Sequence, residues 1–373
     1  MRFFAGFRIF INRFSGKILQ NKRIGCGVIV LHSISTINKI ILSLSFQTNK
    51  SNTMKSVYVI FVALSIIGTC CSCSNDSKDE PAPIYLEDTT LPIADPYVMV
   101  YDGKYYAYGT GGNPSGAGEG IACFSSDNLR YWKREGQALY ARDSYGDKWF
   151  WAPEVYHING KFYMFYSAEE RMCVATSDSP AGPFVQEEQK PMISSYAIDT
   201  SLFHDEKTGK YYLYFVRTTD GNAIWVAEMT DDLRGIRTET MKLCFSATEP
   251  WELKWPKVVE GPSVLEKDGT YYMLYSANSY ESQDYAVGYA TSDSPVGPWQ
   301  KSATNPILRR FQGLMGTGHG APFQTLEGEW KYIFHAHASA GSVQPRTSYI
   351  ADFDFTPGAL GIKPPLISPA VVK

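Results

Sequence analysis

The sequence predicts an all-β protein, a five-bladed β-propeller forming a single domain over about residues 85–370. Three observations lead to this prediction. One hairpin motif recurs five times, its copies are separated by nearly equal lengths of chain, and no stretch between them has the apolar period of a helix.

Each copy of the hairpin has a two-residue turn that ends in glycine, followed by a strand rich in aromatic residues. Glycine suits the second position because a tight hairpin turn needs a positive φ there. The turn glycines are 57, 49, 60 and 59 residues apart. The copies read DGKYYAYGTG (102–111), NGKFYMFYSA (159–168), TGKYYLYFVR (208–217), DGTYYMLYSA (268–277) and EGEWKYIFHA (327–336).

A strand-like segment precedes each hairpin and another follows it, so each unit is expected to contain about four strands. Four-stranded units that repeat every 50–60 residues are typical of propeller blades. A β-sandwich could use the same strands, but it would not explain five nearly equal periods. Stacking the blades in a ring would bury the faces that a single blade leaves exposed.

Three segments are predicted upstream of the propeller. Residues 1–53 carry eight Lys or Arg and no Asp or Glu, and we expect them to be an over-extended N-terminus, with the true start at Met54. Residues 54–73, MKSVYVIFVALSIIGTCCSC, have the order of a lipoprotein signal peptide: a basic residue, an apolar run, then small residues and cysteine. Residues 74–84 are expected to be a polar linker.

The cysteines divide between this signal and the predicted propeller. Cys70 or Cys73 is the expected lipidation site, and the sequence leaves both open. Such a protein would be secreted across the inner membrane and lipid-anchored in the cell envelope. Cys123, Cys173 and Cys244 are too scattered for a disulfide framework or a zinc site, so we expect buried free thiols.

The composition excludes some partners and favours others. A net charge of −3 with 20% charged residues offers no basic face, so nucleic acid is not an expected partner. The chain has 25 Tyr and 8 Trp, whose apolar rings and polar edges suit both sheet packing and stacking on sugars. We therefore expect a monomer, with a carbohydrate as one candidate partner.

Acidic residues stand where the innermost strand of several blades is expected to begin. These openings contain Asp95, Asp199 and Glu260, a fourth contains His319, and the second contains Trp151. In a propeller the five openings meet over one channel, so the carboxyl groups would raise one another's pKa values. A protonated acid and an ionised base on opposite sides of a pocket are what glycoside hydrolysis requires.

Five motifs in these openings resemble those of glycoside hydrolase family 43 and occur in that family's order. They are ADPYV (94–98), WAPEV (151–155), AIDTSLF (197–203), EGPSV (260–264) and GTGHGAPF (316–323). The resemblance covers the whole chain beyond the linker. It implies a five-bladed propeller and an inverting mechanism, mostly on arabinofuranosides and xylosides, and hence a plant-type oligo- or polysaccharide as substrate.

The resemblance also implies a role for individual residues. Asp95 matches the general base, Glu260 the general acid, and Asp199 the third carboxylate, which orients the acid and raises its pKa. His319 matches the channel histidine, which would contact substrate or, through water, a structural calcium ion; no cofactor is expected to be required. Arg346 resembles an arginine of the last blade that reaches substrate.

Together these features predict an inverting glycoside hydrolase of the α-L-arabinofuranosidase/β-xylosidase type, with Trp151 as a wall for a sugar ring. One alternative is a non-catalytic carbohydrate-binding propeller lipoprotein. Endo-arabinanase or β-galactofuranosidase activity on the same fold is another. The related fructan hydrolases retain configuration through an Asp nucleophile in a distinct N-terminal motif, which this sequence lacks.

Overall fold

The computed structural model describes residues 90–111, 120–254 and 256–372. The described residues belong to one compact unit, Ser77–Lys373. The predicted over-extended N-terminus, signal peptide and linker lie outside the described residues, as do Cys70 and Cys73.

The described residues form five sheets, each built around the predicted hairpin. The innermost strands are β1 (Ile93–Tyr101), β5 (Trp151–Ile158), β8 (Ile198–Asp205), β12 (Val259–Lys267) and β16 (Gly318–Gln324). The second strands are β2 (Lys104–Gly111), β6 (Lys161–Ala168), β9 (Lys210–Thr219), β13 (Thr270–Ala277) and β17 (Trp330–Ala336).

The third strands are β3 (Gly120–Ser126), β7 (Arg171–Ser177), β10 (Gly221–Glu228), β14 (Ala286–Ser292) and β18 (Thr347–Asp354). Outer strands are β4 (Tyr131–Tyr140), β11 (Lys242–Phe245), β15 (Gln300–Lys301), β19 (Gly361–Ile367) and β20 (Ala370–Val372). In the described part of the chain the helical segments are short 3-10 turns, η1 (Ala141–Asp143), η2 (Thr238–Thr240) and η3 (Phe311–Gly313).

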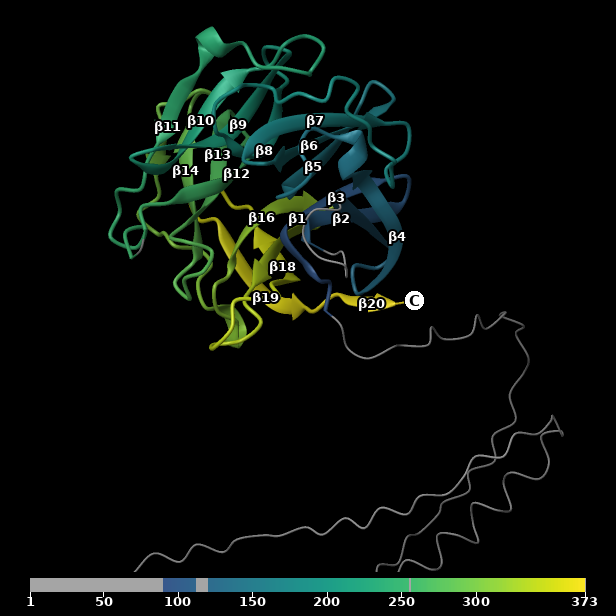
Figure 1. The fold of residues 1–373 in the computed structure, drawn as a ribbon. Helices are drawn as coiled ribbons and strands as arrows, with labels where there is room; N and C mark the ends of the chain where they lie inside the picture. The colour runs from purple at the N-terminus through teal and green to yellow at the C-terminus, as the bar shows by residue number, and fades with distance from the viewer. Residues whose placement is uncertain (1–89, 112–119, 255, 373) are drawn as a thin grey trace, which may run out of the picture. The chain divides into compact units, whose positions relative to one another are not determined.

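The five sheets form a closed ring, as Figure 1 shows. Each innermost strand contacts the innermost strands of two neighbours, in the order β1, β5, β8, β12, β16 and back to β1. The predicted five-bladed β-propeller is therefore confirmed. The starts of the innermost strands meet at one end of the central channel, which we call the mouth.

The prediction of about four strands in each blade holds, with four described strands in three sheets and one strand fewer or more in the other two. The second blade has three strands, β5 to β7, and only an isolated bridge between Thr176 and Val185 takes the place of a fourth. The first blade has five, because β20 pairs in parallel with β4 at its outer edge. The two ends of the described domain therefore meet in one sheet, which closes the ring.

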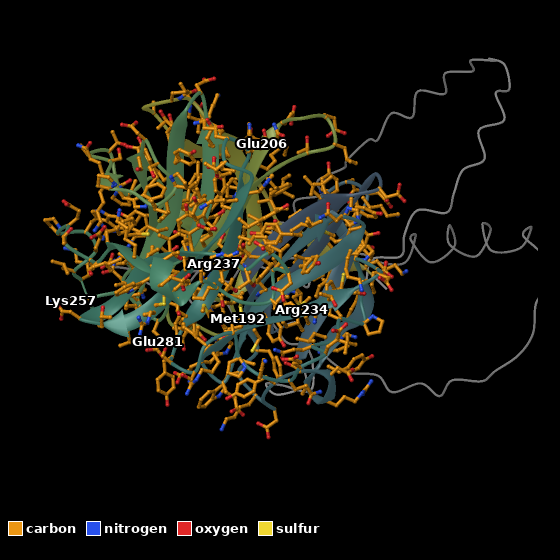
Figure 2. All side chains as sticks on the ribbon, turned by 90° about the horizontal axis from the view of Figure 1, so that it is seen from above. Met192, Glu206, Arg234, Arg237, Lys257 and Glu281 are labelled. Atoms are coloured by element: carbon orange, nitrogen blue, oxygen red, sulfur yellow. The ribbon has the colours of Figure 1, made fainter. Side chains whose placement is uncertain are left out.

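The core consists of five apolar clusters, each shared by two neighbouring blades. Tyr108 of the first blade and Phe162 of the second share one cluster, for example. Because a blade is covered on both faces, its central strands are buried almost throughout instead of alternating; seven of the eight residues of β13 are buried. Figure 2 shows side chains filling the space between the ribbons.

The predicted free thiols are confirmed: Cys123 and Cys173 are buried and Cys244 is half-buried. Burial raises the pKa of Cys173 to about 12, so its thiol is unreactive at neutral pH. Within the three described segments, no helix is long and apolar enough to cross a membrane.

Removal of residues 369–373 tests the ring closure. The deletion takes away the β20–β4 pairing and two backbone bonds of 2.8 Å, Leu91 N–H to Pro369 O and Ala370 N–H to Arg130 O. We expect the free energy of unfolding in urea to fall by roughly 2–4 kcal/mol.

A matched pair of substitutions separates packing from chain length. Val371 packs against the cluster between the first and fifth blades, whereas Val372 alternates to the other face of the strand. Val371→Ser should therefore destabilise the protein more than Val372→Ser. Equal stability of the truncated and full chains would show that β20 does not close the ring.

Candidate active site

Every innermost strand is interrupted close to its start by a shift of register against the second strand. Such a bulge re-aims side chains and frees a backbone N–H from the ladder. One residue in each bulge has a positive φ, which is unusual for residues other than glycine. These residues are Asp95 (47°), Ala152 (43°), Asp199 (56°), Gly261 (56°) and His319 (38°).

In four blades, a side chain from the second strand of the preceding blade accepts the freed N–H of the bulge residue. The acceptor always stands opposite the residue before the bulge in its own hairpin. The bonds are Ala152 N–H to Thr110 Oγ1 (2.9 Å), Asp199 N–H to Ser167 Oγ (3.1 Å), His319 N–H to Ser276 Oγ (2.8 Å) and Asp95 N–H to His335 Nδ1 (3.0 Å).

The N–H of the fifth bulge residue, Gly261, has a different kind of acceptor. The corresponding position in the third blade is Val216, which pairs with Ile198 and has no acceptor in its side chain. The N–H of Gly261 donates instead to Asp199 Oδ2, at 3.3 Å. One blade's missing acceptor is thus replaced by a carboxylate, and that bond orients Asp199 in the channel.

The three predicted carboxylates meet at the mouth. The sequence predicts equivalent positions for them, but the structure shows that their positions in the strands differ. Asp95 and Asp199 are bulge residues, whereas Glu260 stands one residue before its bulge, where the second blade has Trp151. The bulge position of the fourth blade is Gly261, and a Cβ there would lie 2.9 Å from the ring of His319. The glycine thus allows the imidazole to lie against the backbone.

Asp95 is surrounded by cationic and imidazole groups. Arg346 donates from Nη1 to Oδ1 at 2.9 Å and from Nη2 to Oδ2 at 3.5 Å, and His319 Nδ1 lies 3.4 Å from Oδ1. Burial alone would raise the pKa of Asp95, but Arg346, His319 and His335 hold this pKa well below its usual value. The carboxyl group is therefore ionised throughout the neutral range.

Glu260 lies in the opposite electrostatic situation. Burial and the charge of Asp95 raise its pKa to about 7, although hydrogen bonds from Tyr285 and Asn222 counteract the rise. Tyr285 donates to Oε1 at 2.8 Å, and Asn222 Nδ2 donates to Oε2 at 3.4 Å. A substantial fraction of Glu260 is consequently protonated near neutral pH.

Asp199 lies between these two groups. Its pKa is raised well above the usual value by burial and by the charges of Glu260 and Asp95. His319 Nδ1 lies 3.9 Å from its Oδ2. The site therefore combines one carboxylate held ionised with two carboxyl groups that retain protons more readily, which is the pattern that separates a base from an acid.

Tyr285 and Asn222 were missed by the sequence analysis. Tyr285 is fully buried, stacks on His335 with ring centroids 5.6 Å apart, and passes over Gly318, where a Cβ would lie 2.5 Å from the ring. The sequence contained only a weak signal for it, the glycine beside His319. His335 itself is a structural residue, and burial lowers its pKa to about 3, so it remains neutral.

A small cavity lies in the channel beneath the mouth. It is lined by the five bulge residues and by Tyr97 and Glu154, among others. Glu154 accepts a hydrogen bond from Tyr156, and burial raises its pKa to about 8. Trp151 stands at the rim above, half-buried and stacked on Trp149 with centroids 5.9 Å apart.

The role of Gly261 can be tested by Gly261→Ala, with Gly160→Ala as the control. Both glycines have positive φ, but a Cβ at Gly160 meets nothing within 4 Å, whereas one at Gly261 contacts the ring of His319. We expect Gly160→Ala to lower the free energy of unfolding by about 1 kcal/mol, and Gly261→Ala by clearly more. Equal losses in urea titrations would mean that His319 moves freely.

Comparison with known proteins matches this arrangement to one family. Residues 90–359 match the model of glycosyl hydrolases family 43. The chain is 27% identical to a β-xylosidase of Xylanibacter ruminicola, over 65% of this chain and 86% of the relative. It is 26% identical to a xylosidase/arabinosidase of Bacteroides ovatus, over 65% of this chain and 85% of the relative.

Solved structures agree with the sequence comparison. An endo-1,4-β-xylanase from Bacteroides thetaiotaomicron is 61% identical and superposes with a TM-score of 0.75, over 77% of this chain and 99% of that one. A thermostable family-43 glycoside hydrolase is 35% identical, with a TM-score of 0.68, over 74% of this chain and 95% of that one. The family predicted from the five motifs is therefore confirmed: the chain belongs to glycosyl hydrolases family 43.

Proposed function

We propose that this protein is an inverting glycosidase that releases arabinofuranose or xylose from plant polysaccharide side chains or oligosaccharides. The observation that carries the proposal is the opposite pKa shift of two carboxyl groups at the mouth of one channel, Asp95 downward and Glu260 upward. The names of the relatives, xylosidase/arabinosidase among them, support this range of sugars.

In the proposed reaction, Glu260 is the general acid and Asp95 the general base. Asp95 removes a proton from a water molecule as that water attacks the anomeric carbon. The glycosidic C–O bond breaks with its electron pair on the leaving oxygen, which takes the proton of Glu260. Water must fit between the base and the sugar, so an inverting enzyme is expected to separate the two carboxyl groups by roughly 6.5–9.5 Å.

Other residues would hold the reacting groups in place. Asp199 lies close enough to Glu260 for the charge of Glu260 to raise the pKa of Asp199, and it is fixed by the N–H of Gly261. Arg346 keeps Asp95 ionised, and its guanidinium lies over the ring of Tyr280, with Cζ 4.4 Å from the centroid. Trp151 and His319 would border the bound sugar.

We had also expected a calcium ion near His319. In the segments that the structure describes, no three His, Cys, Asp or Glu side chains are grouped as metal ligands. The Nδ1 atom of His319 faces Asp95 and Asp199. A structural calcium ion that binds through water near His319 stays part of the proposal, and no step of the proposed mechanism passes through it.

We further propose that the protein is exported and lipid-anchored in the cell envelope through Cys70 or Cys73, with the propeller acting as a monomer. The support is the order of residues 54–73, a basic start, an apolar run and a cysteine-containing end. Mass spectrometry of the membrane fraction would identify the modified cysteine. Recovery of the unmodified protein in the soluble fraction would overturn the proposal.

Specific alternatives differ in substrate. The chain is 25% identical to a β-D-galactofuranosidase of Aspergillus niger over 263 residues. It is also 28% identical to a probable arabinan endo-1,5-α-L-arabinosidase B of Aspergillus fumigatus over 260 residues. A lectin would need neither an acid nor a base in the pocket, so the opposed pKa shifts favour catalysis.

The first prediction for this activity concerns the two carboxyl groups. Glu260→Gln and Asp95→Asn should each lower kcat/KM by at least about 100-fold on whichever nitrophenyl α-L-arabinofuranoside, β-D-xylopyranoside or β-D-galactofuranoside the protein cleaves. Glu266→Gln, an exposed acid on the same strand as Glu260, is the control and should leave activity unchanged. Full activity in either site variant would exclude that residue from its role.

The second prediction concerns pH. The acid must be protonated, so activity should fall as the pH rises through about 7, the pKa of Glu260. The base must be ionised, and its lowered pKa should extend activity well into the acid range. The substitution Arg346→Gln removes the cation that lowers the pKa of Asp95. The acid side of the profile of kcat/KM against pH should therefore move to higher pH.

The substitution Tyr285→Phe should move the alkaline side of the profile of kcat/KM against pH. Its hydroxyl donates to Glu260 and stabilises the carboxylate, so removing it raises the pKa of Glu260 and shifts the alkaline limb upward. The measurement is kcat/KM against pH for both variants. A Tyr285→Phe profile that matches the wild type on its alkaline side would contradict the assignment of that limb to Glu260.

A further inference from the structure

Exposed aromatic side chains are concentrated at the mouth of the propeller. Only three of the Tyr, Trp and Phe side chains in the described residues are exposed: Trp149 (41%), Tyr196 (60%) and Tyr280 (38%). Trp149 lies two residues before β5, Tyr196 two residues before β8, and Tyr280 three residues after β13. All three positions belong to the end of the channel where the carboxyl groups meet.

Trp149 is held out of the core by its backbone. Its φ of 59° is unusual for a bulky residue, while the next residue, Phe150, is buried against Tyr166. The indole lies nearly parallel to that of Trp151, at 18°, and Lys148 Nζ lies 4.5 Å from its centroid. A strained backbone that exposes an apolar ring points to a ligand for that ring.

Tyr196 is supported on one face only. The guanidinium of Arg171 covers that face, with Cζ 3.8 Å from the ring centroid. Three main-chain carbonyls fix the guanidinium: Nε donates to Ser194 O (3.0 Å), and Nη1 donates to Glu169 O (3.3 Å) and Glu170 O (3.4 Å). The other face of the ring is left for a second planar partner.

The two aromatic groups are anchored to the same tight turn. Glu169 N–H donates to Lys148 O at 3.2 Å, beside Trp149, and Ala197 N–H donates to Glu170 O at 3.1 Å, beside Tyr196. Glu169 and Glu170 are consecutive residues, both with positive φ, between β6 and β7. The rings therefore flank one two-residue turn at the rim of blades two and three.

We propose that Trp149 with Trp151, and Tyr196 with Arg171, form two stacking platforms for a xylopyranose chain that extends beyond the sugar in the central pocket. This inference rests on the proposed glycosidase function and specifies its substrate. A β-xylopyranose ring carries its substituents equatorially and presents flat C–H faces to an aromatic ring. An arabinofuranose ring is puckered and has an exocyclic group, so it stacks less closely.

The site would therefore act on sugars attached to, or within, a xylan-type main chain, with the platforms holding the part of the chain that lies outside the central pocket. The 61% identity to the structure of an endo-1,4-β-xylanase supports a pyranose main chain over an arabinan. Arg346 covers the ring of Tyr280 beside Asp95, so this third exposed aromatic belongs to the catalytic pocket and not to the platforms.

Binding of oligosaccharides to the Glu260→Gln protein tests the inference without turnover. By titration calorimetry, xylohexaose should bind at least ten-fold more tightly than xylobiose. We call this ratio of affinities for xylohexaose and xylobiose the chain-length gain. In Trp149→Ala and in Tyr196→Ala the gain should fall by about ten-fold, as expected for the loss of one stacked ring. Tyr196→Phe keeps the ring and should keep the gain.

The control is Tyr131→Ala, which removes another tyrosine with an arginine over its ring, Arg130 at 5.5 Å, at the opposite end of its blade. It should leave the gain intact, and thermal midpoints check that each variant is folded. An unchanged gain in both alanine variants overturns the platforms. A larger gain for α-1,5-arabinohexaose than for xylohexaose overturns the pyranose assignment.

Hydrolysis of the nitrophenyl glycosides by the unsubstituted protein separates this inference from the proposed function. Hydrolysis together with the chain-length gain supports both. Hydrolysis without a gain from xylobiose to xylohexaose overturns the platforms and leaves the glycosidase standing. Absence of hydrolysis and of xylo-oligosaccharide binding overturns both.

Discussion

The site depends on a break in the hydrogen-bond ladder that is repeated in all five innermost strands. Each break turns one residue into the left-handed region and frees its N–H. Because the blades are arranged in a ring, the five residues point into one channel. The same local device therefore places Asp95, Asp199 and the imidazole of His319 in the channel, and it allows a glycine to stand where the imidazole needs space.

Satisfying the freed N–H groups links the blades to one another. All five are accepted by a side chain of the preceding blade, so the position of each site residue depends on its neighbour. One of these acceptors is Asp199 itself. The bond from Gly261 N–H to Asp199 thus links two blades and also orients a residue of the site. It couples the architecture of the propeller to the chemistry proposed for it.

Burial affects the carboxyl groups alike, and their neighbours make them different. Desolvation raises the pKa of Asp95, Asp199 and Glu260, but only Asp95 has a cation in direct contact. Arg346 reaches it from the last blade, across the closure of the ring. Glu260 has only neutral donors, Tyr285 and Asn222, which lower its pKa less than burial raises it. One carboxyl group that stays ionised and one that retains its proton more readily follow from this difference.

The sequence by itself determined the repeat, and through the repeat the fold. Five hairpins with glycine turns are local patterns, and near-equal spacing leaves few ways to bury their faces other than a propeller. It also showed that Asp95, Asp199, Glu260 and His319 stand at the openings of the innermost strands, because those positions are defined relative to the hairpins.

Only the tertiary structure decided how these residues differ. It placed Glu260 one residue before its bulge, because register depends on pairing with the second strand and a shift of one residue changes the side-chain direction. It brought Tyr285 to Glu260 and the Arg171–Tyr196 stack to the same rim as Trp149. These contacts join loops and neighbouring blades, and no period along the chain records them.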